Sequence, residues 1–152
     1  MKQRDLIKRL EAIIMKSVYP VIFTQTDDDK NTVLIEVPDL DIFTEGYGMA
    51  DAIEMARDAI GLAGITLEDM GKEIPLPMDR RDVNLPETEF AKEGRQFLSL
   101  VDIDFTEYRR KVDNRSVRRN VTLPNWLNRE AEKAHINVSR VLQEALMQKM
   151  NL

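Results

Sequence analysis

One short stretch near the C-terminus, residues 118–124, constrains the fold of this chain more than any other part of it. Polar and apolar side chains alternate along it, so Arg118, Asn120 and Thr122 share one face of an extended strand. The opposite face carries Arg119, Val121 and Leu123. A lone strand leaves backbone N–H and C=O groups without partners. The sequence therefore predicts pairing with a second copy, giving a two-stranded antiparallel ribbon that fits the DNA major groove.

Two short amphipathic helices are predicted directly after this strand. Pro124 suits the first turn of a helix, where its missing N–H is no loss. Asn137 is a good N-cap for the second helix. The apolar side chains at helical spacing are Leu127, Ala131 and Ala134 in the first helix, and Val138, Val141, Leu142, Ala145, Leu146 and Met150 in the second. A segment of about forty residues cannot bury this stripe alone, so we expect dimerisation.

The charges divide in the same part of the chain. From Arg109 onward there are 10 Lys and Arg residues against 4 Asp and Glu residues, a net charge of +6. The residues before Arg109 hold 12 basic and 23 acidic side chains, a net charge of −11. A charge run alone is typical of a solvated surface. Carried on a ribbon with a capped helix behind it, the basic end favours contact with nucleic acid.

The strand and its two helices resemble the ribbon-helix-helix family of DNA-binding domains over roughly residues 116–151. If the ribbon enters the major groove, we expect Arg118 to donate to guanine and Asn120 to adenine. Thr122 would meet a base or a thymine methyl group. Arg119 faces inward by strict alternation, so we expect it to pack at the ribbon edge or reach a phosphate. A polar dimer edge is the other interpretation of the outward-facing side chains.

The start of the second helix is the expected phosphate contact. The backbone N–H groups of Val138 and Ser139 are free to donate there, and the side chains of Ser139 and Arg140 lie beside them. Trp126 adjoins the apolar stripe of the first helix, so we expect it to pack and not to stack on a base.

The part of the chain before the basic tail predicts a small α+β unit. Strands are expected at residues 18–26, 32–37, 43–45 and 97–103. A helix is expected at residues 49–63, where Met49, Ala52, Ile53, Ala56, Ile60 and Ala63 follow at helical spacing. The order β-β-β-α-β favours a sheet covered on one face by a helix.

The composition excludes several kinds of protein. The absence of cysteine excludes disulfides and thiolate zinc sites. No apolar run approaches the roughly 20 residues of a membrane span. The charged N-terminus lacks the long apolar stretch of a secretory signal. We therefore expect a cytoplasmic protein without membrane contact.

Several short motifs, in their order and spacing, resemble the HicB antitoxins. In the first part of the chain they are residues 19–23, 37–40, Gly46 followed by 49–52, and 75–77. In the tail they are residues 108–110, 113–114, 117–124 and 137–146. The resemblance covers about residues 18–150.

This resemblance implies a protein partner. Proteins similar to this one bind and neutralise HicA, a small ribonuclease toxin that cleaves messenger RNA. Their N-terminal domain is a reduced ribonuclease-H-like fold that covers the active surface of the toxin. Their C-terminal domain binds operator DNA and represses the operon. The resemblance thus implies a non-enzymatic antitoxin and autorepressor, an obligate homodimer whose dimers can pair on adjacent half-sites. An acidic body suits a basic, RNA-binding toxin.

Four segments follow from these patterns. Residues 18–106 are expected to form the toxin-neutralising domain, residues 107–115 a basic linker, and residues 116–152 the ribbon-helix-helix domain. Residues 1–17 are expected to form an extra amphipathic helix outside the family core, with apolar Leu6, Ile7, Leu10, Ile13 and Ile14. Residues 1–10 look like the opening of a HicA toxin. The segment is either a fusion remnant or an additional docking helix.

Two positions depart from the family pattern. His135 stands at the end of the first tail helix, where glycine is common because a positive φ is favoured. We expect a local cost there and an intact fold. Gly48 replaces a threonine-type N-cap before Met49, which weakens the helix start slightly.

Two other functions remain open. The acidic side chains Asp27, Asp28, Asp29, Asp39, Asp41 and Glu45 invite comparison with a metal-dependent nuclease such as ribonuclease H. They cluster in turns, however, where aspartate is favoured for backbone reasons. The other alternative is a ribbon-helix-helix transcription regulator whose N-terminal domain senses a small molecule, although no glycine-rich phosphate loop is present. We expect no catalytic residues, no cofactor and no metal.

Overall fold

The computed structural model describes residues 16–152, and the chain divides into two compact units, Met1–Asn114 and Arg115–Leu152. The extra helix expected over residues 1–17 therefore lies almost wholly outside the described residues. Its last two residues, Lys16 and Ser17, belong to a strand instead, because they pair with Asp104 and Ile103 of another strand. None of the described helices is long and apolar enough to cross a lipid bilayer.

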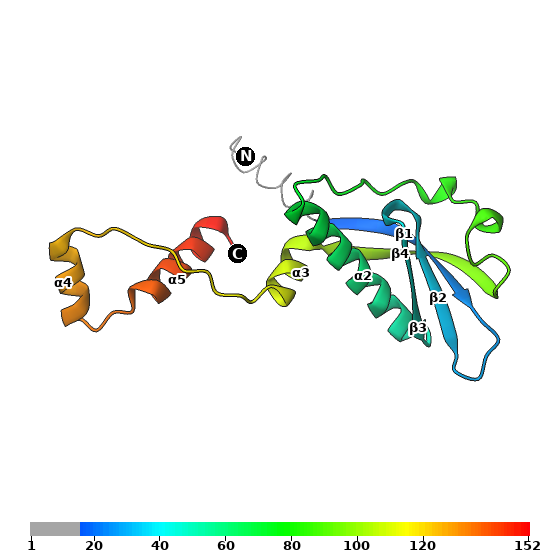
Figure 1. The fold of residues 1–152 in the computed structure, drawn as a ribbon, viewed down its shortest axis with the longest axis horizontal. Coiled ribbons are helices and arrows are strands. Elements are labelled where there is room, and N and C mark those ends of the chain that lie inside the picture. The colour runs from blue at the N-terminus through cyan, green and yellow to red at the C-terminus, as the bar shows by residue number, and fades with distance from the viewer. Residues whose placement is uncertain (1–15) are drawn as a thin grey trace. The chain divides into compact units, whose positions relative to one another are not determined.

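A four-stranded antiparallel sheet forms the centre of the first unit (Figure 1). Its elements are β1 (Lys16–Gln25), β2 (Thr32–Val37), β3 (Ile42–Tyr47), the long helix α2 (Met49–Asp69) and β4 (Arg95–Asp104). The strands lie in the order β3-β2-β1-β4, and α2 covers one face. The predicted β-β-β-α-β order and the helix-covered sheet are confirmed. β2 has the predicted bounds, whereas β3 and β4 are longer than predicted and β1 starts earlier.

The core lies between α2 and the sheet. Alternate residues of three strands point toward the helix and are at most 6% exposed: Tyr19, Val21, Phe23, Val33, Ile35, Val37, Val101 and Ile103. The helix contributes Ala52, Ala56 and Ile60, all fully buried, as the helical spacing predicted. The two alanines keep the helix close to the strands, so the branched and aromatic side chains of the sheet fill the space.

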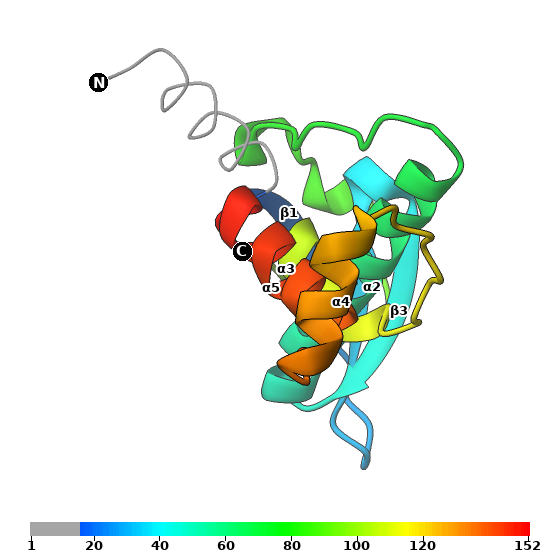
Figure 2. The ribbon, with the colours of Figure 1, turned by 90° about the vertical axis from the view of Figure 1, so that its left-hand side faces the viewer.

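The connection from α2 to β4 packs against the other face of the sheet. Its first part, drawn in green, runs along the top of the unit in Figures 1 and 2. Further on, the Glu36 carboxylate of β2, only 8% exposed, accepts the backbone N–H of Glu89 at 3.1 Å. Phe90 packs edge-on against Phe43, with ring centroids 5.8 Å apart. Burial beneath this connection raises the pKa of Glu36.

The basic linker predicted for residues 107–115 is wrong for residues 107–112, which belong to helix α3 (Phe105–Val112). Asp104 caps this helix, its side chain accepting the backbone N–H of Glu107 at 3.0 Å. Arg109, Arg110 and Lys111 stand in the last turn, where cations suit the helix dipole. The local sequence therefore contains both the N-cap and the charge pattern of a helix. The run of basic residues had suggested a linker instead.

Two glycines of α2, Gly61 and Gly64, form a notch that receives α3. A Cβ atom on Gly61 would lie 2.5 Å from the Tyr108 ring, and one on Gly64 would overlap the Phe105 ring. Glycine is a poor helix former, yet here it allows two helices to approach. This contact explains why α2 runs six residues beyond the predicted end at Ala63.

Polar contacts fasten α3 beside this glycine notch. The Tyr108 hydroxyl donates to Asp58 at 2.8 Å, and burial with this hydrogen bond raises the pKa of Tyr108 to about 12. The Arg109 guanidinium donates to Glu68 at 2.8 Å and Asp69 at 2.9 Å. Arg109 therefore forms its ion pairs within the acidic first unit, although the charge pattern of the sequence had grouped it with the basic tail.

Replacing Gly64→Ala should destabilise the first unit by about 1–3 kcal/mol, because the overlap with Phe105 outweighs the roughly 1 kcal/mol gain in helix propensity. The free energy of unfolding from urea denaturation is the measurement. The double substitution Gly64→Ala with Phe105→Leu should recover part of the loss, since leucine vacates the space. Unchanged stability of Gly64→Ala would show that α3 does not pack in the glycine notch.

Candidate functional site

The second unit consists of two helices preceded by irregular backbone. The helices are α4 (Asn125–Lys133) and α5 (Val138–Met150), as predicted. Residues 113–124 have no regular secondary structure, so the strand predicted for residues 118–123 is not formed in the single chain. The physical reason is that a strand is stable only beside a partner strand, which satisfies its backbone N–H and C=O groups.

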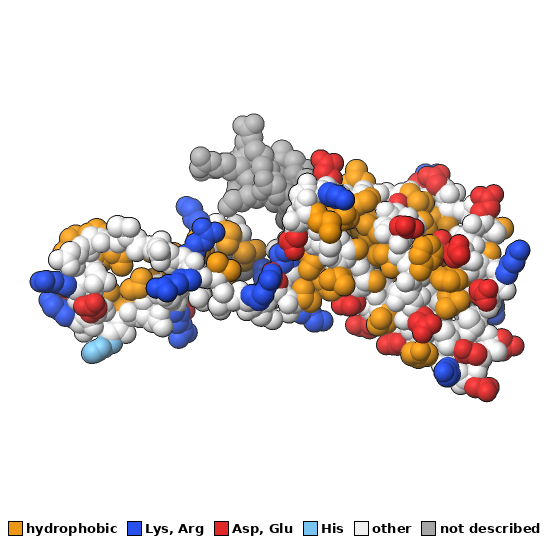
Figure 3. Space-filling model, in the orientation of Figure 1, with side chains coloured by type: hydrophobic (Ala, Val, Ile, Leu, Met, Phe, Trp, Pro, Cys, Tyr) orange, Lys and Arg blue, Asp and Glu red, His pale blue; other side chains and the backbone are white. Residues whose placement is uncertain are grey.

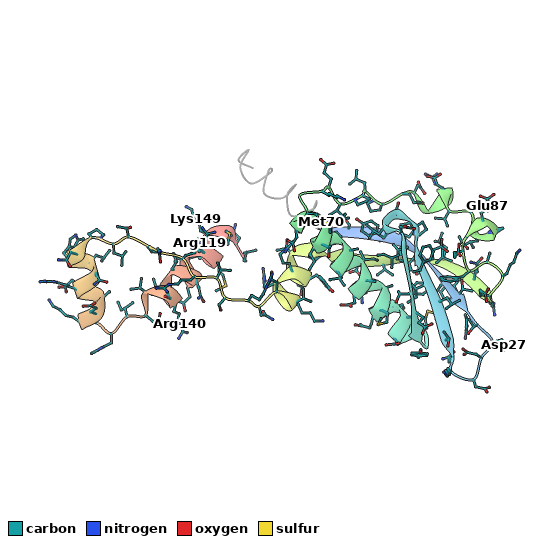
Figure 4. The ribbon with its side chains drawn as sticks, in the orientation of Figure 1. Asp27, Met70, Glu87, Arg119, Arg140 and Lys149 are labelled. Carbon is teal, nitrogen blue, oxygen red and sulfur yellow. The ribbon has the colours of Figure 1, made fainter. Side chains whose placement is uncertain are left out.

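The side chains predicted to meet DNA bases are all accessible. Arg118, Asn120 and Thr122 are exposed, and so is Arg119, which Figure 4 labels. Their shared face is not fixed in the single chain, because the backbone that would align them is not a strand. The single chain thus presents the predicted groups without bringing them into one site.

The turn between α4 and α5 has a defined geometry centred on His135. The His135 backbone has a φ of 53°, in the left-handed region that favours the glycine common in the family at this position. Its N–H donates to the Glu132 carbonyl at 3.0 Å, and the Ile136 N–H donates to the Ala131 carbonyl at 2.9 Å. These two bonds form a Schellman motif, which ends α4 and sets the direction of α5.

The N-terminus of α5 is capped as predicted. The Asn137 side chain accepts the backbone N–H of Arg140 at 3.1 Å. This bond leaves the first-turn N–H groups of Val138 and Ser139 at the positive end of the helix dipole. The Arg140 Nε donates to Glu144 one turn along, at 2.9 Å (Figure 4). An anion at this helix start would compete with Glu144 for Arg140.

Residues 115–152 are all described, and none of the side chains of this second unit is buried. Along the predicted stripe of α5, Val141 is 50% exposed, Leu146 49% and Met150 56%. Trp126, predicted to pack, is 67% exposed. Apolar side chains that are aligned on one stripe and largely exposed mark an interaction surface.

The described parts of the two units carry opposite net charge (Figure 3). Residues 16–114 hold 22 acidic and 11 basic side chains, whereas residues 115–152 hold 3 acidic and 7 basic ones. Moving Arg109, Arg110 and Lys111 into the first unit lowers the positive charge of the tail. The first unit nevertheless remains negative and the second remains positive. The first therefore suits a positively charged partner, and the second suits a negatively charged one.

Asp28, in the β1–β2 turn, accepts hydrogen bonds from the backbone. The Asp28 carboxylate accepts the N–H groups of Lys30 at 3.1 Å and Thr32 at 2.9 Å, and hydrogen bonding by Thr32 lowers the pKa of Asp28. Asp27 stands just before the turn, where β1 leads into the loop (Figure 4). Among the described residues, no three His, Cys, Asp or Glu side chains converge as a metal site requires. The acids that invited comparison with a nuclease, Asp27, Asp28, Asp29, Asp39, Asp41 and Glu45, are therefore exposed or half-buried groups with no common metal site among the described residues.

Comparison with solved structures finds one chain of similar fold and a second, weaker alignment. A chain of a toxin–antitoxin complex from Streptococcus pneumoniae aligns with a TM-score of 0.56 at 23% identity, covering 88% of this chain and 99% of that one. The antitoxin HicB of Burkholderia pseudomallei aligns with a TM-score of 0.46 at 22% identity, covering 89% and 97%. No curated protein matches the chain.

The fold is thus that of a small α+β unit followed by two short helices. A family model of the HicB-like antitoxins of bacterial toxin–antitoxin systems matches residues 19–147. Because this match spans most of the sequence, the chain belongs to the HicB-like antitoxin family.

Replacing His135→Gly should stabilise the second unit by about 0.5–1 kcal/mol. Relief of the left-handed conformation, about 1–2 kcal/mol, exceeds the entropy that glycine loses on folding. Denaturation followed by Trp126 fluorescence at fixed protein concentration measures the change. Ala134→Gly is the matched control: its φ is −83°, so glycine there should only destabilise. Equal effects at both positions would contradict a strained His135.

Proposed function

We propose that this protein binds and blocks a HicA-type, mRNA-cleaving toxin and represses its own operon by binding operator DNA. Family membership supports the antitoxin role, and the fold likeness to a chain of a toxin–antitoxin complex agrees with it. The separate charges of the two units support a division of labour. The first unit takes the toxin and the second takes DNA.

The first unit, a reduced ribonuclease-H-like fold in this proposal, blocks the toxin by covering it. A ribonuclease binds the phosphates of its substrate, so its working surface is basic. The described part of the first unit has a net charge of −11. Charge complementarity speeds the encounter and fixes the orientation, and the covered surface then excludes RNA. The antitoxin makes and breaks no covalent bond in this mechanism.

The second unit binds DNA as a dimer. The observation that carries this proposal is the apolar stripe of α5, none of whose side chains is buried in the single chain. Two copies cover each other's stripes while residues 118–123 of each chain pair into an antiparallel ribbon. Pairing aligns Arg118, Asn120 and Thr122 on one face, where they reach guanine, adenine and thymine edges in the major groove.

The start of α5 holds the DNA backbone. The N–H groups of Val138 and Ser139 donate to a phosphate at the positive end of the helix dipole, and the Ser139 hydroxyl adds a further bond. Arg140 leaves Glu144 and joins the same phosphate. These contacts set the register of the ribbon, while the ribbon side chains supply specificity. Dimers on adjacent half-sites then fill the operator.

The double substitution Arg118→Ala with Asn120→Ala should abolish specific operator binding and leave toxin neutralisation intact. Growth on co-expression with the toxin from the neighbouring gene measures neutralisation, and a mobility-shift assay measures operator binding. Asn128→Ala with Arg129→Ala is the matched control, because it removes the same two side-chain types from α4, outside the ribbon. Loss of neutralisation in a folded Arg118/Asn120 variant would refute the division of labour. Failure of the unaltered chain to rescue growth would refute the antitoxin role.

Operator affinity should fall steeply with salt. A dimer that contacts about six phosphates releases their counterions, so the affinity should drop roughly a thousandfold between about 50 and 200 mM salt. A titration of operator DNA at several salt concentrations gives the slope. Ser139→Ala should leave this slope unchanged, because serine is neutral, whereas Arg140→Ala should reduce it. A flat salt response would contradict phosphate contacts.

A further inference from the structure

β3 lies at one edge of the sheet, and within the described residues it pairs only with β2 (Figure 1). The Gly48 N–H, just past β3, donates at 2.8 Å to the carbonyl of the residue before β2. The Tyr47 N–H points the other way and donates to the Asp51 carboxylate of α2 at 2.8 Å. Alternate residues of an antiparallel strand direct both backbone groups to the same side. The backbone groups of Phe43 and Glu45 therefore also face away from β2, on the open side of the strand.

Aromatic side chains are exposed beside this open edge. Phe43 is 49% exposed and Tyr47 is 56% exposed. A Cβ atom on Gly46 would meet the backbone of Ala52 in α2, so Gly46 faces the helix. The side chains of Phe43, Glu45 and Tyr47 therefore project from the opposite face of the sheet. The Tyr47 hydroxyl donates to the Glu45 carboxylate at 3.0 Å, which holds the ring beside that charge.

The surroundings of this row of three side chains are acidic. A hollow of about 590 Å³ borders the row, between the β1–β2 connection and the segment that leads into β4. The charged side chains of its lining are Asp27, Asp28, Glu45 and Glu93, against the single Lys30. A second copy of this acidic unit would bring like charges together, whereas a basic partner would pair with them.

The opposite edge of the sheet is partly closed by a cation. The Arg57 guanidinium donates to the Asp102 carbonyl of β4 at 3.3 Å and to the Asp102 carboxylate at 3.0 Å. A long basic side chain at an edge strand hinders pairing with a further strand. β3 carries the carboxylate of Glu45 at its open edge instead. Of the two edges, β3 is therefore the one that suits a basic strand.

We propose that the open edge of β3 takes an extended strand of the toxin, which pairs with β3 and continues the sheet. Backbone hydrogen bonds to Phe43 and Glu45 supply affinity, as in other cases of strand addition. Basic side chains of the incoming strand meet Glu45 and the acids of the hollow, and apolar ones pack on Phe43 and Tyr47. This inference rests on the function proposed above and deepens it by naming the surface that takes the toxin.

Amide hydrogen exchange in the full chain, followed by NMR, tests the proposal without altering the sequence. A catalytically inactive form of the toxin from the neighbouring gene should slow exchange at Phe43 and Glu45 at least about tenfold, because their N–H groups become hydrogen-bonded. The amide of Leu100 is the internal control. It faces outward from β4, as does Asp102 two residues on, and its exchange should not change.

Charge reversal at the same edge gives a second readout. Glu45→Lys should weaken toxin binding about tenfold or more in isothermal titration calorimetry, because like charges then face each other. Glu107→Lys is the matched control. It makes the same change of charge at an exposed position of α3, away from β3, and should leave the affinity nearly unchanged. Urea denaturation shows whether each variant is folded.

The outcomes separate this inference from the antitoxin role itself. Unchanged exchange at Phe43 and Glu45 in a chain that binds the toxin would overturn the inference and leave the antitoxin role standing. Equal losses of affinity in the two lysine variants would also overturn it, since net charge alone would then decide binding. Slow exchange at these amides in the free chain, lost on dilution, would make a second copy the occupant. Failure of the unaltered chain to bind the toxin would overturn both.

Discussion

The covering of apolar side chains is the constraint on which the second unit depends. Residues 115–152 form one irregular stretch and two short helices, and none of their side chains is buried in the single chain. A segment of about forty residues has too little interior to hold its own stripe. In the proposed dimer, three changes are therefore one event. The strands of the two chains pair, their helices cover each other's apolar stripes, and the polar side chains align on one face of the ribbon.

The first unit covers its apolar side chains within one chain. Its sheet is covered by α2 on one face and partly by the connection to β4 on the other. The glycine notch lets α3 close the end of the core through Phe105, which is 2% exposed. Because the core is closed internally, the acidic side chains are free to form the outer surface. A rigid, charged exterior is what a steric and electrostatic block requires.

Elements with a strong local pattern could be predicted from the sequence. The stripe and the Asn137 cap gave α5 its predicted start, and the glycine-like conformation of His135 was expected from the family pattern at the helix end. β2 was bounded correctly because a short run rich in β-branched apolar residues ends at Pro38. In each case the residues that decide the element lie within it or directly beside it.

Elements decided by distant contacts were missed. Helix α3 has a capping pattern, Asp104 with Glu107 three residues on, but the run of basic residues suggested a linker. The extension of α2 past Ala63 depends on Phe105 and Tyr108, some forty residues away in the sequence. The predicted ribbon face of Arg118, Asn120 and Thr122 depends on another chain, so neither the sequence nor the single chain determines its geometry.

The division into two units also separates the natural chromophores of the protein. The single tryptophan, Trp126, and the single histidine, His135, both belong to the second unit, whereas Tyr19, Tyr47 and Tyr108 all belong to the first. Tryptophan emission and histidine proton resonances thus report on one unit, and tyrosine absorbance on the other. Each half of the molecule carries its own spectroscopic label, and their unfolding can be followed separately without chemical modification.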